Sequence, residues 1–327
     1  MRIFCTLFDK NYLYKGLTLY TTLAKHSADF HLWVLCMDET TFAVLDKMNL
    51  KNVSLIRSSE FENERLLAAK KERTVAEYSW TCTANLCWYL LGKIKDGETI
   101  TYLDADMAFF SDPEAIFQEM ADASIAIVGH RLEGERKTME KYVGKYNVAW
   151  VSFKKDEQGM KASEWWKERV LEWCFARFEG GKIGDQHYLN DWTERFKNVH
   201  VVSHEGADVA PWNVANRKIT ARDGKMYIGS AELVFYHFHS FTLVHEHFYL
   251  PAPAYYIPRS AQRYIYDVYF KEMQQNIAAV SKVDPVFHFG FKKNYLKSYI
   301  AQKVFSCRFI EYFYIKYCHY NLKRSHG

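Results

Sequence analysis

Strand-like and helical patterns alternate along the first 130 residues, and this alternation limits the possible folds more than any other feature of the chain. The expected strands cover 2–8, 30–36, 53–56, 99–103 and 123–128. The expected helices between them lie near 12–26, 39–48, 60–72 and 76–91. Repeated units of this kind predict an α/β fold, with a mainly parallel sheet and helices on both faces. Ligands of such sheets bind at the carboxyl ends of the strands.

Beyond residue 130 the chain continues to mix expected strands and helices, and no linker between domains is evident. We expect a strand at 146–153, helices at 158–178 and from 184, irregular chain at 204–230, a strand at 231–238 and helices beyond 260. A helix is also expected after Ser111, because Ser111 and Glu114 have the spacing of a capping box and Pro113 lies in the first turn.

Composition narrows the class of protein. A net charge of +4 over 327 residues does not indicate a nucleic-acid partner. The seven cysteines are scattered and form no C-x-x-C pair, which argues against a zinc knuckle or a disulfide framework and for a reducing compartment. The chain starts on an expected core strand and has no uncharged apolar run of 18 residues, so we expect a cytoplasmic protein.

Two aspartates, Asp104 and Asp106, follow the apolar strand at 99–103 in TYLDADMAFF. Like charges at a buried strand end persist mainly where a cation or hydrogen-bond donors compensate them. Carboxylate oxygens suit Mg²⁺ or Mn²⁺, particularly when a bound diphosphate completes the octahedron. The alternative is that the pair only caps the following loop, and position alone does not decide between the two.

Histidines in FYHFHSF form a second candidate site. His237 and His239 share one face of a strand, and His245 and His247 repeat the spacing. They could be partly buried structural histidines or a zinc site. One of them could also join the aspartates in a mixed oxygen–nitrogen site that favours Mn²⁺.

Polar and aromatic residues elsewhere have the composition of a sugar cleft. Asp185 and Gln186 open the segment GDQHYLND, where they either cap a helix or bind hydroxyl groups. Asn147 at a strand start could be a turn residue, and Trp212 could belong to the core. Aromatic faces beside amides and carboxylates are what carbohydrate ligands require.

In this order, the motifs resemble the GT-A nucleotide-sugar glycosyltransferases, closest to family 8 and its bacterial relatives. LFDKNYLYKGL matches the opening strand and base-binding segment, YLDADMAFFSD the D-x-D pattern, and YNVAW the F-N-x-G strand. DQHYLN matches D-Q-D-x-L-N with His187 in place of the second aspartate, and HFHS matches H-F-x-G with Ser240 in place of glycine. The usual K-P-W that follows is missing. The match covers roughly residues 1–245.

This resemblance implies a GT-A (Rossmann-like) domain at 1–250 and a helical C-terminal extension at 251–327. It implies a cation, Mn²⁺ or Mg²⁺, held by Asp104, Asp106 and His237, with Asp104 also facing the nucleotide-sugar donor. The other implied donor-binding residues are Asp9, Tyr12, Arg73, Tyr78, Thr81, Asn147 and Trp212, with Asp185 and Gln186 beside the reacting carbon.

The function implied is retaining transfer of a sugar from a nucleoside diphosphate, UDP favoured, to a hydroxyl of a glycan or lipid-linked acceptor in bacterial surface glycan synthesis. A sugar nucleotidyltransferase and a non-catalytic sugar-binding protein are the alternatives. The segment 292–324 carries eight basic residues against one acidic residue, among many aromatics. It is expected either to lie on an anionic membrane surface, at the inner face of the membrane, or to pack on the domain.

Overall fold

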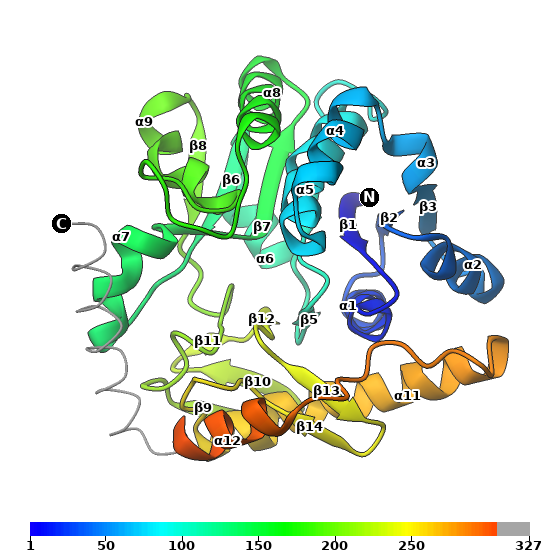
Figure 1. Cartoon of the computed structure of the whole chain (residues 1–327). Helices are drawn as coiled ribbons and strands as arrows, with labels where there is room; N and C mark the ends of the chain where they lie inside the picture. Colours follow the sequence, from blue (N-terminus) through cyan, green and yellow to red (C-terminus); the bar gives the residue numbers. More distant parts are fainter. Residues whose placement is uncertain (306–327) are drawn as a thin grey trace.

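A seven-stranded sheet forms the centre of the molecule, and the computed structural model describes residues 1–305 of the chain. Its strands are β1 (Arg2–Phe8), β2 (Phe30–Cys36), β3 (Val53–Arg57), β4 (Thr99–Leu103), β6 (Ile125–Gly129), β7 (Tyr146–Lys154) and β8 (Val199–Val202). They lie in the order β3-β2-β1-β4-β7-β6-β8 (Figure 1). Within this sheet β7 runs antiparallel to both of its neighbours, and the other pairs are parallel. The predicted α/β fold, with a mainly parallel central sheet flanked by helices, is confirmed.

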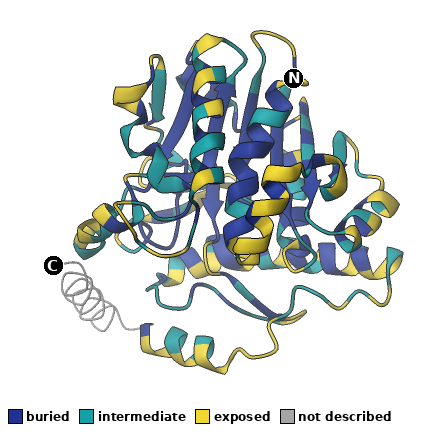
Figure 2. Cartoon of the chain, turned by 45° about the horizontal axis from the view of Figure 1, so that its top comes forward, coloured by how far each residue is buried: buried dark blue, intermediate teal, exposed yellow. Residues whose placement is uncertain are grey.

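Helices cover both faces of the sheet because successive strand residues point to opposite faces. In β1, Phe4 and Phe8 belong to one core, while Ile3, Cys5 and Leu7 belong to the other. The first core receives α1 (Leu13–His26), α2 (Glu39–Met48) and α6 (Glu114–Met120). The second receives α3 (Ser58–Phe61), α4 (Glu64–Glu72), α5 (Val75–Leu91), α8 (Glu157–Glu172) and α9 (Trp192–Arg195). In Figure 2 the strands are mostly buried, and the covering helices carry the exposed residues.

Three small antiparallel sheets lie below the main sheet in Figure 1. They are formed by β5 (Met107–Phe109) with β12 (Phe235–His237), by β9 (Ile219–Arg222), β10 (Lys225–Ile228) and β11 (Ala231–Glu232), and by β13 (Thr242–His245) with β14 (Phe248–Leu250). The β5–β12 pair is the important one for the site, because its register sets His237 opposite Met107.

The helical C-terminal extension packs against the first core. It contains α10 (Arg259–Ala261), η3 (Gln262–Tyr266), α11 (Asp267–Val283) and α12 (Leu296–Phe305). Tyr269 of α11 stacks on Phe238 with ring centroids 3.6 Å apart, and Asn276 donates to Thr18 of α1 at 3.2 Å. The remaining short elements are η1 (Gly134–Met139), α7 (Glu140–Val143) and η2 (Gln186–Asp191). Between residues 1 and 305, no helix has the length and apolar character needed to cross a bilayer.

Several local predictions differ from the structure. The segment predicted as one helix at 60–72 is split into α3 and α4, because Asn63 caps a new helix by accepting from the Leu66 amide at 3.0 Å. The helix predicted at 158–178 ends at Glu172, and the strand predicted at 231–238 is broken into β11 and β12. The segment 184–192 opens a short 3-10 helix, η2, before α9.

The predicted capping box of Ser111 and Glu114 is wrong. Ser111 donates its hydroxyl to the carbonyl of Leu233, and the Glu114 carboxylate receives two hydrogen bonds from Arg2. Asp112 instead accepts from the Glu114 amide at 2.9 Å at the start of α6. Long-range partners on neighbouring elements therefore outweigh the local cap.

Candidate active site

A cleft of about 730 Å³ opens at the carboxyl end of the parallel strands. Its walls come from the ends of β1 and β4, from one side of α5, from 130–148, from 183–186 and from the end of β12. Nine of the twelve residues predicted for the site line it: Asp9, Tyr12, Asp104, Asp106, Asn147, Asp185, Gln186, Trp212 and His237. This is the position at which α/β sheets bind ligands.

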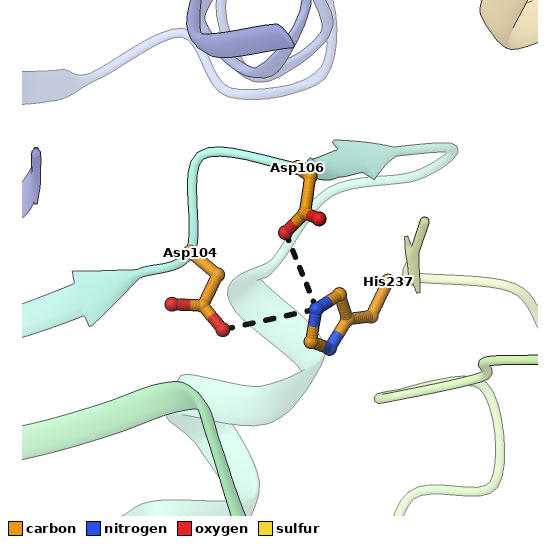
Figure 3. A group of neighbouring side chains, drawn as sticks. All are labelled: Asp104, Asp106 and His237. Carbon is orange, nitrogen blue, oxygen red and sulfur yellow. Dashed lines mark ion pairs between the residues drawn. The ribbon is translucent and has the colours of Figure 1, made fainter. Parts of the chain in front are cut away.

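Asp104, Asp106 and His237 point toward one another on one side of the cleft (Figure 3). Asp104 follows the last residue of β4, and Asp106 immediately precedes β5. His237 ends β12, whose pairing with β5 sets it opposite Met107, and the Phe238 amide donates to the Asp106 carbonyl at 2.8 Å. The Nε2 atom of His237 lies 3.2 Å from Oδ1 of Asp106 and 3.8 Å from Oδ2 of Asp104. Strand register therefore joins two parts of the chain that are far apart in sequence.

Burial and mutual attraction shift the pKa values of this group. Burial, helped by repulsion from Asp106, raises the pKa of Asp104 to about 6 against the attraction of His237. Burial also opposes the ionisation of Asp106, but the charge and hydrogen bond of His237, with help from Lys15, hold its pKa well below the usual range. Burial favours the neutral ring of His237, yet the charge of Asp106 outweighs it and raises the pKa to about 9. Without a metal, the His237 imidazolium therefore balances part of the carboxylate charge.

The group fits a divalent cation. One ligand atom from each of the three residues lies within 4.8 Å of the others. A half-buried carboxylate, a buried carboxylate and a buried imidazole make a mixed oxygen–nitrogen donor set, which suits Mn²⁺ better than Ca²⁺. A cation would take the place of the His237 proton in balancing the carboxylates, since metal binding displaces protons from its ligands. His239, the other candidate ligand, lines the cleft but does not belong to this group.

Lys15 is a residue of this site that sequence reasoning missed. It belongs to α1, and its ammonium lies 3.8 Å from Oδ2 of Asp106 and 4.2 Å from the centre of the Tyr12 ring. Only 12% of its side chain is exposed. In the sequence it looks like an ordinary surface lysine of a helix, because nothing local indicates that α1 begins beside the aspartates.

Asp208 is a second missed residue. It is fully buried, and its Oδ1 lies 3.9 Å from Nδ1 of His237, on the side of the ring opposite the two aspartates. Burial raises the pKa of Asp208 to about 6 against the attraction of His237 and Arg131. In the sequence it lies in a Gly- and Asp-rich stretch that reads as loop, so no local signal marks it.

Asp9 and Tyr12 lie together at the end of β1. The Asp9 carboxylate accepts hydrogen bonds from the Asn11 amide at 3.0 Å and the Tyr12 amide at 3.2 Å, which forms a turn into α1. The Tyr12 side chain is 43% exposed. Its ring is therefore accessible on the wall of the cleft.

Asn147, His130 and Trp212 form a hydrogen-bonded wall. Nδ1 of His130 donates to the Gly144 carbonyl at 2.9 Å, so its Nε2 accepts from the Asn147 side-chain amide at 3.1 Å. The β6–β7 register shifts between Ile127 and Val128, and this irregularity brings Asn147 opposite Val128. Trp212 donates to the His130 carbonyl at 2.8 Å. Trp212 is thus a cleft-lining residue that also holds a neighbouring wall residue in place.

Asp185 and Gln186 line the cleft at the start of η2. Burial, with repulsion from Asp104, raises the pKa of Asp185 to about 8. The amide nitrogen of Gln186 donates to the Val143 carbonyl at 2.8 Å, which leaves its amide oxygen as the atom able to face positive charge. No side-chain cap from Asp185 is found at η2, so the alternative of a helix cap is wrong.

The structure does not place Arg73, Tyr78 and Thr81 in the cleft. Arg73 donates to Thr81 and to the Leu171 carbonyl, and Tyr78 donates to Glu62 at 2.8 Å. For Tyr78 and Thr81 the physical reason is helix phase, since residues spaced by three or four share one side of a helix, whereas Arg73 precedes α5 at the end of α4. The side of α5 that faces the cleft carries Val75, Ala76, Ser79, Trp80 and Thr83.

Comparison with known proteins finds relatives over most of the chain, although no family model matches it. The uncharacterized protein YfnD of Bacillus subtilis (strain 168) is 33% identical over 291 residues, which cover 88% of this chain and 94% of YfnD. The uncharacterized protein YfnF of the same organism is 32% identical over 303 residues, which cover 88% of this chain and 96% of YfnF. The galactosyltransferase LgtC, solved with donor and acceptor sugar analogs, matches with 15% identity and a TM-score of 0.49 over 84% of this chain and 95% of LgtC. A likeness this distant does not by itself assign an activity.

Proposed function

This chain belongs to the same family as YfnD and YfnF of Bacillus subtilis, and from its cleft we propose that it is a metal-dependent glycosyltransferase of the hexosyltransferase type. The proposed reaction moves a sugar from a nucleoside-diphosphate sugar, with UDP favoured, to an acceptor hydroxyl in bacterial surface glycan synthesis. The observation that carries it is the convergence of Asp104, Asp106 and His237 in a cleft that also contains amide, carboxyl and aromatic side chains.

Asp104, Asp106 and His237 would hold Mn²⁺ or Mg²⁺ against the donor diphosphate. Bound there, the ion would neutralise negative charge on the leaving group. Lys15 would also neutralise negative charge on the diphosphate, because its ammonium lies beside Asp106. The chain lacks the K-P-W lysine of the family it resembles, and Lys15 is the cation that we assign to the diphosphate in its place.

The nucleotide and the sugar would occupy opposite sides of this centre. We assign the base to Asp9 and Tyr12, whose ring is accessible for stacking. We assign the sugar hydroxyls to Asn147 and Asp185. With its raised pKa, Asp185 is largely protonated near pH 7, so it can donate a hydrogen bond as well as accept one.

Retention of anomeric configuration is proposed from the resemblance to family 8, and it determines the role that we give to Gln186. Retention requires either a carboxylate nucleophile beneath the sugar or departure and attack on one face through an oxocarbenium-like state. An amide is a poor nucleophile, and the free oxygen of Gln186 can stabilise positive charge on the anomeric carbon. We therefore favour the same-face route, in which Gln186 acts electrostatically.

A lipid-linked acceptor would bring the enzyme to an anionic membrane surface. Along α12, Leu296, Ile300 and Val304 lie on one side and are 66%, 54% and 40% exposed, and Lys297 and Lys303 are exposed nearby. Such a helix suits the interface of an anionic bilayer. Residues 306–324 of the predicted segment lie outside the part of the chain that the structure describes. Equal binding of full-length protein and protein lacking 292–327 to anionic vesicles would contradict this part of the proposal.

The primary test is thermal unfolding with UDP, GDP or CDP, each with and without Mn²⁺. We expect one nucleotide to raise the unfolding midpoint only when Mn²⁺ is present. Asp104→Asn should remove this effect, while the matched control Asp223→Asn, at an exposed turn away from the cleft, should retain it. Absence of stabilisation by every nucleotide would contradict the proposal. Turnover of a panel of nucleotide sugars, with the anomeric configuration of the product read by NMR, then tests donor and retention.

A further inference from the structure

Asp208 has surroundings that a purely structural carboxylate would not need. It is fully buried, and neither carboxylate oxygen accepts a hydrogen bond from any residue between 1 and 305. Its backbone has a φ of 47°, in the left-handed region. Burying a carboxylate without hydrogen bonds is costly, and aspartate tolerates this backbone region without favouring it as glycine does. A site that combines both features suggests a role for this side chain.

The backbone around Asp208 holds it beside His237. The Asp208 carbonyl accepts from the Asn213 side chain at 3.0 Å, and the His237 amide donates to the Val209 carbonyl at 2.8 Å. Trp212 packs edge-on against the His237 ring with centroids 5.2 Å apart. The carboxylate and the imidazole are therefore held in facing positions by main-chain and aromatic contacts.

The two nitrogens of the His237 ring face different partners. Nε2 faces Asp106 and Asp104, while Nδ1 faces Oδ1 of Asp208 at 3.9 Å. Among the described residues Nδ1 has no hydrogen-bond partner of its own. A histidine that binds a metal through one ring nitrogen generally directs the N–H of the other at a carboxylate or carbonyl.

We propose that Asp208 is a positioning residue, whose carboxylate keeps a proton on Nδ1 of His237 and thereby leaves Nε2 as the ligand for a divalent cation. This inference rests on the metal site of the proposed function. It assigns Asp208 no contact with the nucleotide, the sugar or the metal.

A structural role for Asp208 is the competing explanation. Arg131 is half-buried, and its charge acts on the Asp208 carboxylate. Arg131 donates to the His204 carbonyl at 2.9 Å, so it has another partner within the same loop. If Asp208 served chiefly to balance Arg131, removing its charge would lower stability and leave metal affinity unchanged.

The test measures Mn²⁺ affinity by calorimetry on the full-length protein without nucleotide, beside the unfolding midpoint in EDTA. Asp208→Asn keeps the shape and tolerates the positive φ, and Asp223→Asn, at a φ of 51° in an exposed turn, is the matched control. We expect Asp208→Asn to bind Mn²⁺ about 10- to 100-fold more weakly, with an EDTA midpoint no lower than that of the wild type. If Asp208→Asn does not fold, Asp208→Gly removes the carboxylate at a backbone conformation that glycine adopts freely, and the same loss of affinity is expected.

The outcomes separate this inference from the proposed function. Wild-type protein that bound no Mn²⁺ would overturn the metal site and the role of Asp208 with it. Wild-type binding that was matched by Asp208→Asn within about twofold would overturn the role of Asp208 alone, since coupling through a metal-bound histidine is expected to be at least tenfold.

Discussion

Relative to wild type, Asp185→Asn should stabilise the metal-free protein by an amount that grows as the pH rises. The same substitution should impair sugar transfer. Burial raises the pKa of Asp185 to about 8, from about 3.9 in an unfolded chain. The folded protein therefore resists ionisation that the unfolded chain accepts. The stability that this carboxyl contributes is complete below pH 4 and is lost progressively as the pH rises to about 8. An asparagine avoids that loss because its side chain does not ionise.

The size of the effect follows from the width of the pH interval. Each pH unit between the two pKa values changes the free energy of unfolding by about 1.36 kcal/mol, so wild type should lose about 2.7 kcal/mol relative to Asp185→Asn between pH 5 and pH 7. An unfolding entropy of about 2.1 cal/mol/K per residue, over the length of this chain, converts this into a midpoint difference that grows by about 4 °C. The assay is thermal unfolding in EDTA at both pH values, with Asp223→Asn as the control. A midpoint difference between wild type and Asp185→Asn that is the same at pH 5 and pH 7 would refute the reasoning.

Three further predictions address residues that the sequence placed wrongly or not at all. Glu77 accepts from the Ala176 amide at 2.7 Å and from Thr74, and these bonds lower its pKa, so its stabilisation is present above about pH 4.5 and lost as the pH falls. Glu77→Gln should lower the free energy of unfolding at pH 7 by about 2 kcal/mol, measured by urea unfolding, and its difference from wild type should shrink as the pH falls below about 4.5. Lys15→Met should weaken UDP binding in Mn²⁺ about tenfold by calorimetry without weakening Mn²⁺ binding alone, and unchanged UDP affinity would contradict its diphosphate role. Thr83→Val, which alters the cleft side of α5, should raise the donor KM about threefold or more, whereas Thr81→Val should not; the reverse result would contradict the helix phase.

Much of the fold could be predicted because its signals are local. β1, β2 and β4 have the predicted bounds, since each is a short, mostly apolar run with a polar residue within two positions of its end. The reversed direction of β7 could not be predicted, because its sequence is as apolar as that of a parallel strand and direction depends on how the connections cross the sheet. The division of the chain at residue 250 stays a prediction.

The sequence predicts those site residues that belong to a recognisable motif. It does not predict those that reach the site only through the packing of distant elements. Asp104 and Asp106 are marked by the strand before them, and His237 by its resemblance to a family motif. Lys15 and Asp208 join them only through the start of α1 and the loop beside β12, and these contacts have no sequence signal. The orientation of α5 could not be predicted either, because a motif on this helix does not by itself show which side of the helix faces the cleft.

The β5–β12 pairing also governs when this site can exist during synthesis of the protein. Asp104 and Asp106 leave the ribosome well before His237, and the strand that carries His237 is supported by the stack of Phe238 on Tyr269 of α11. A nascent chain that has formed most of the main sheet therefore presents two aspartates without their histidine. A bound ion would tie the two strands together and close a loop of more than a hundred residues, for which the entropic cost rises only slowly with length. Metal supply should then affect the last stage of maturation, in which the C-terminal third docks, more than the formation of the sheet.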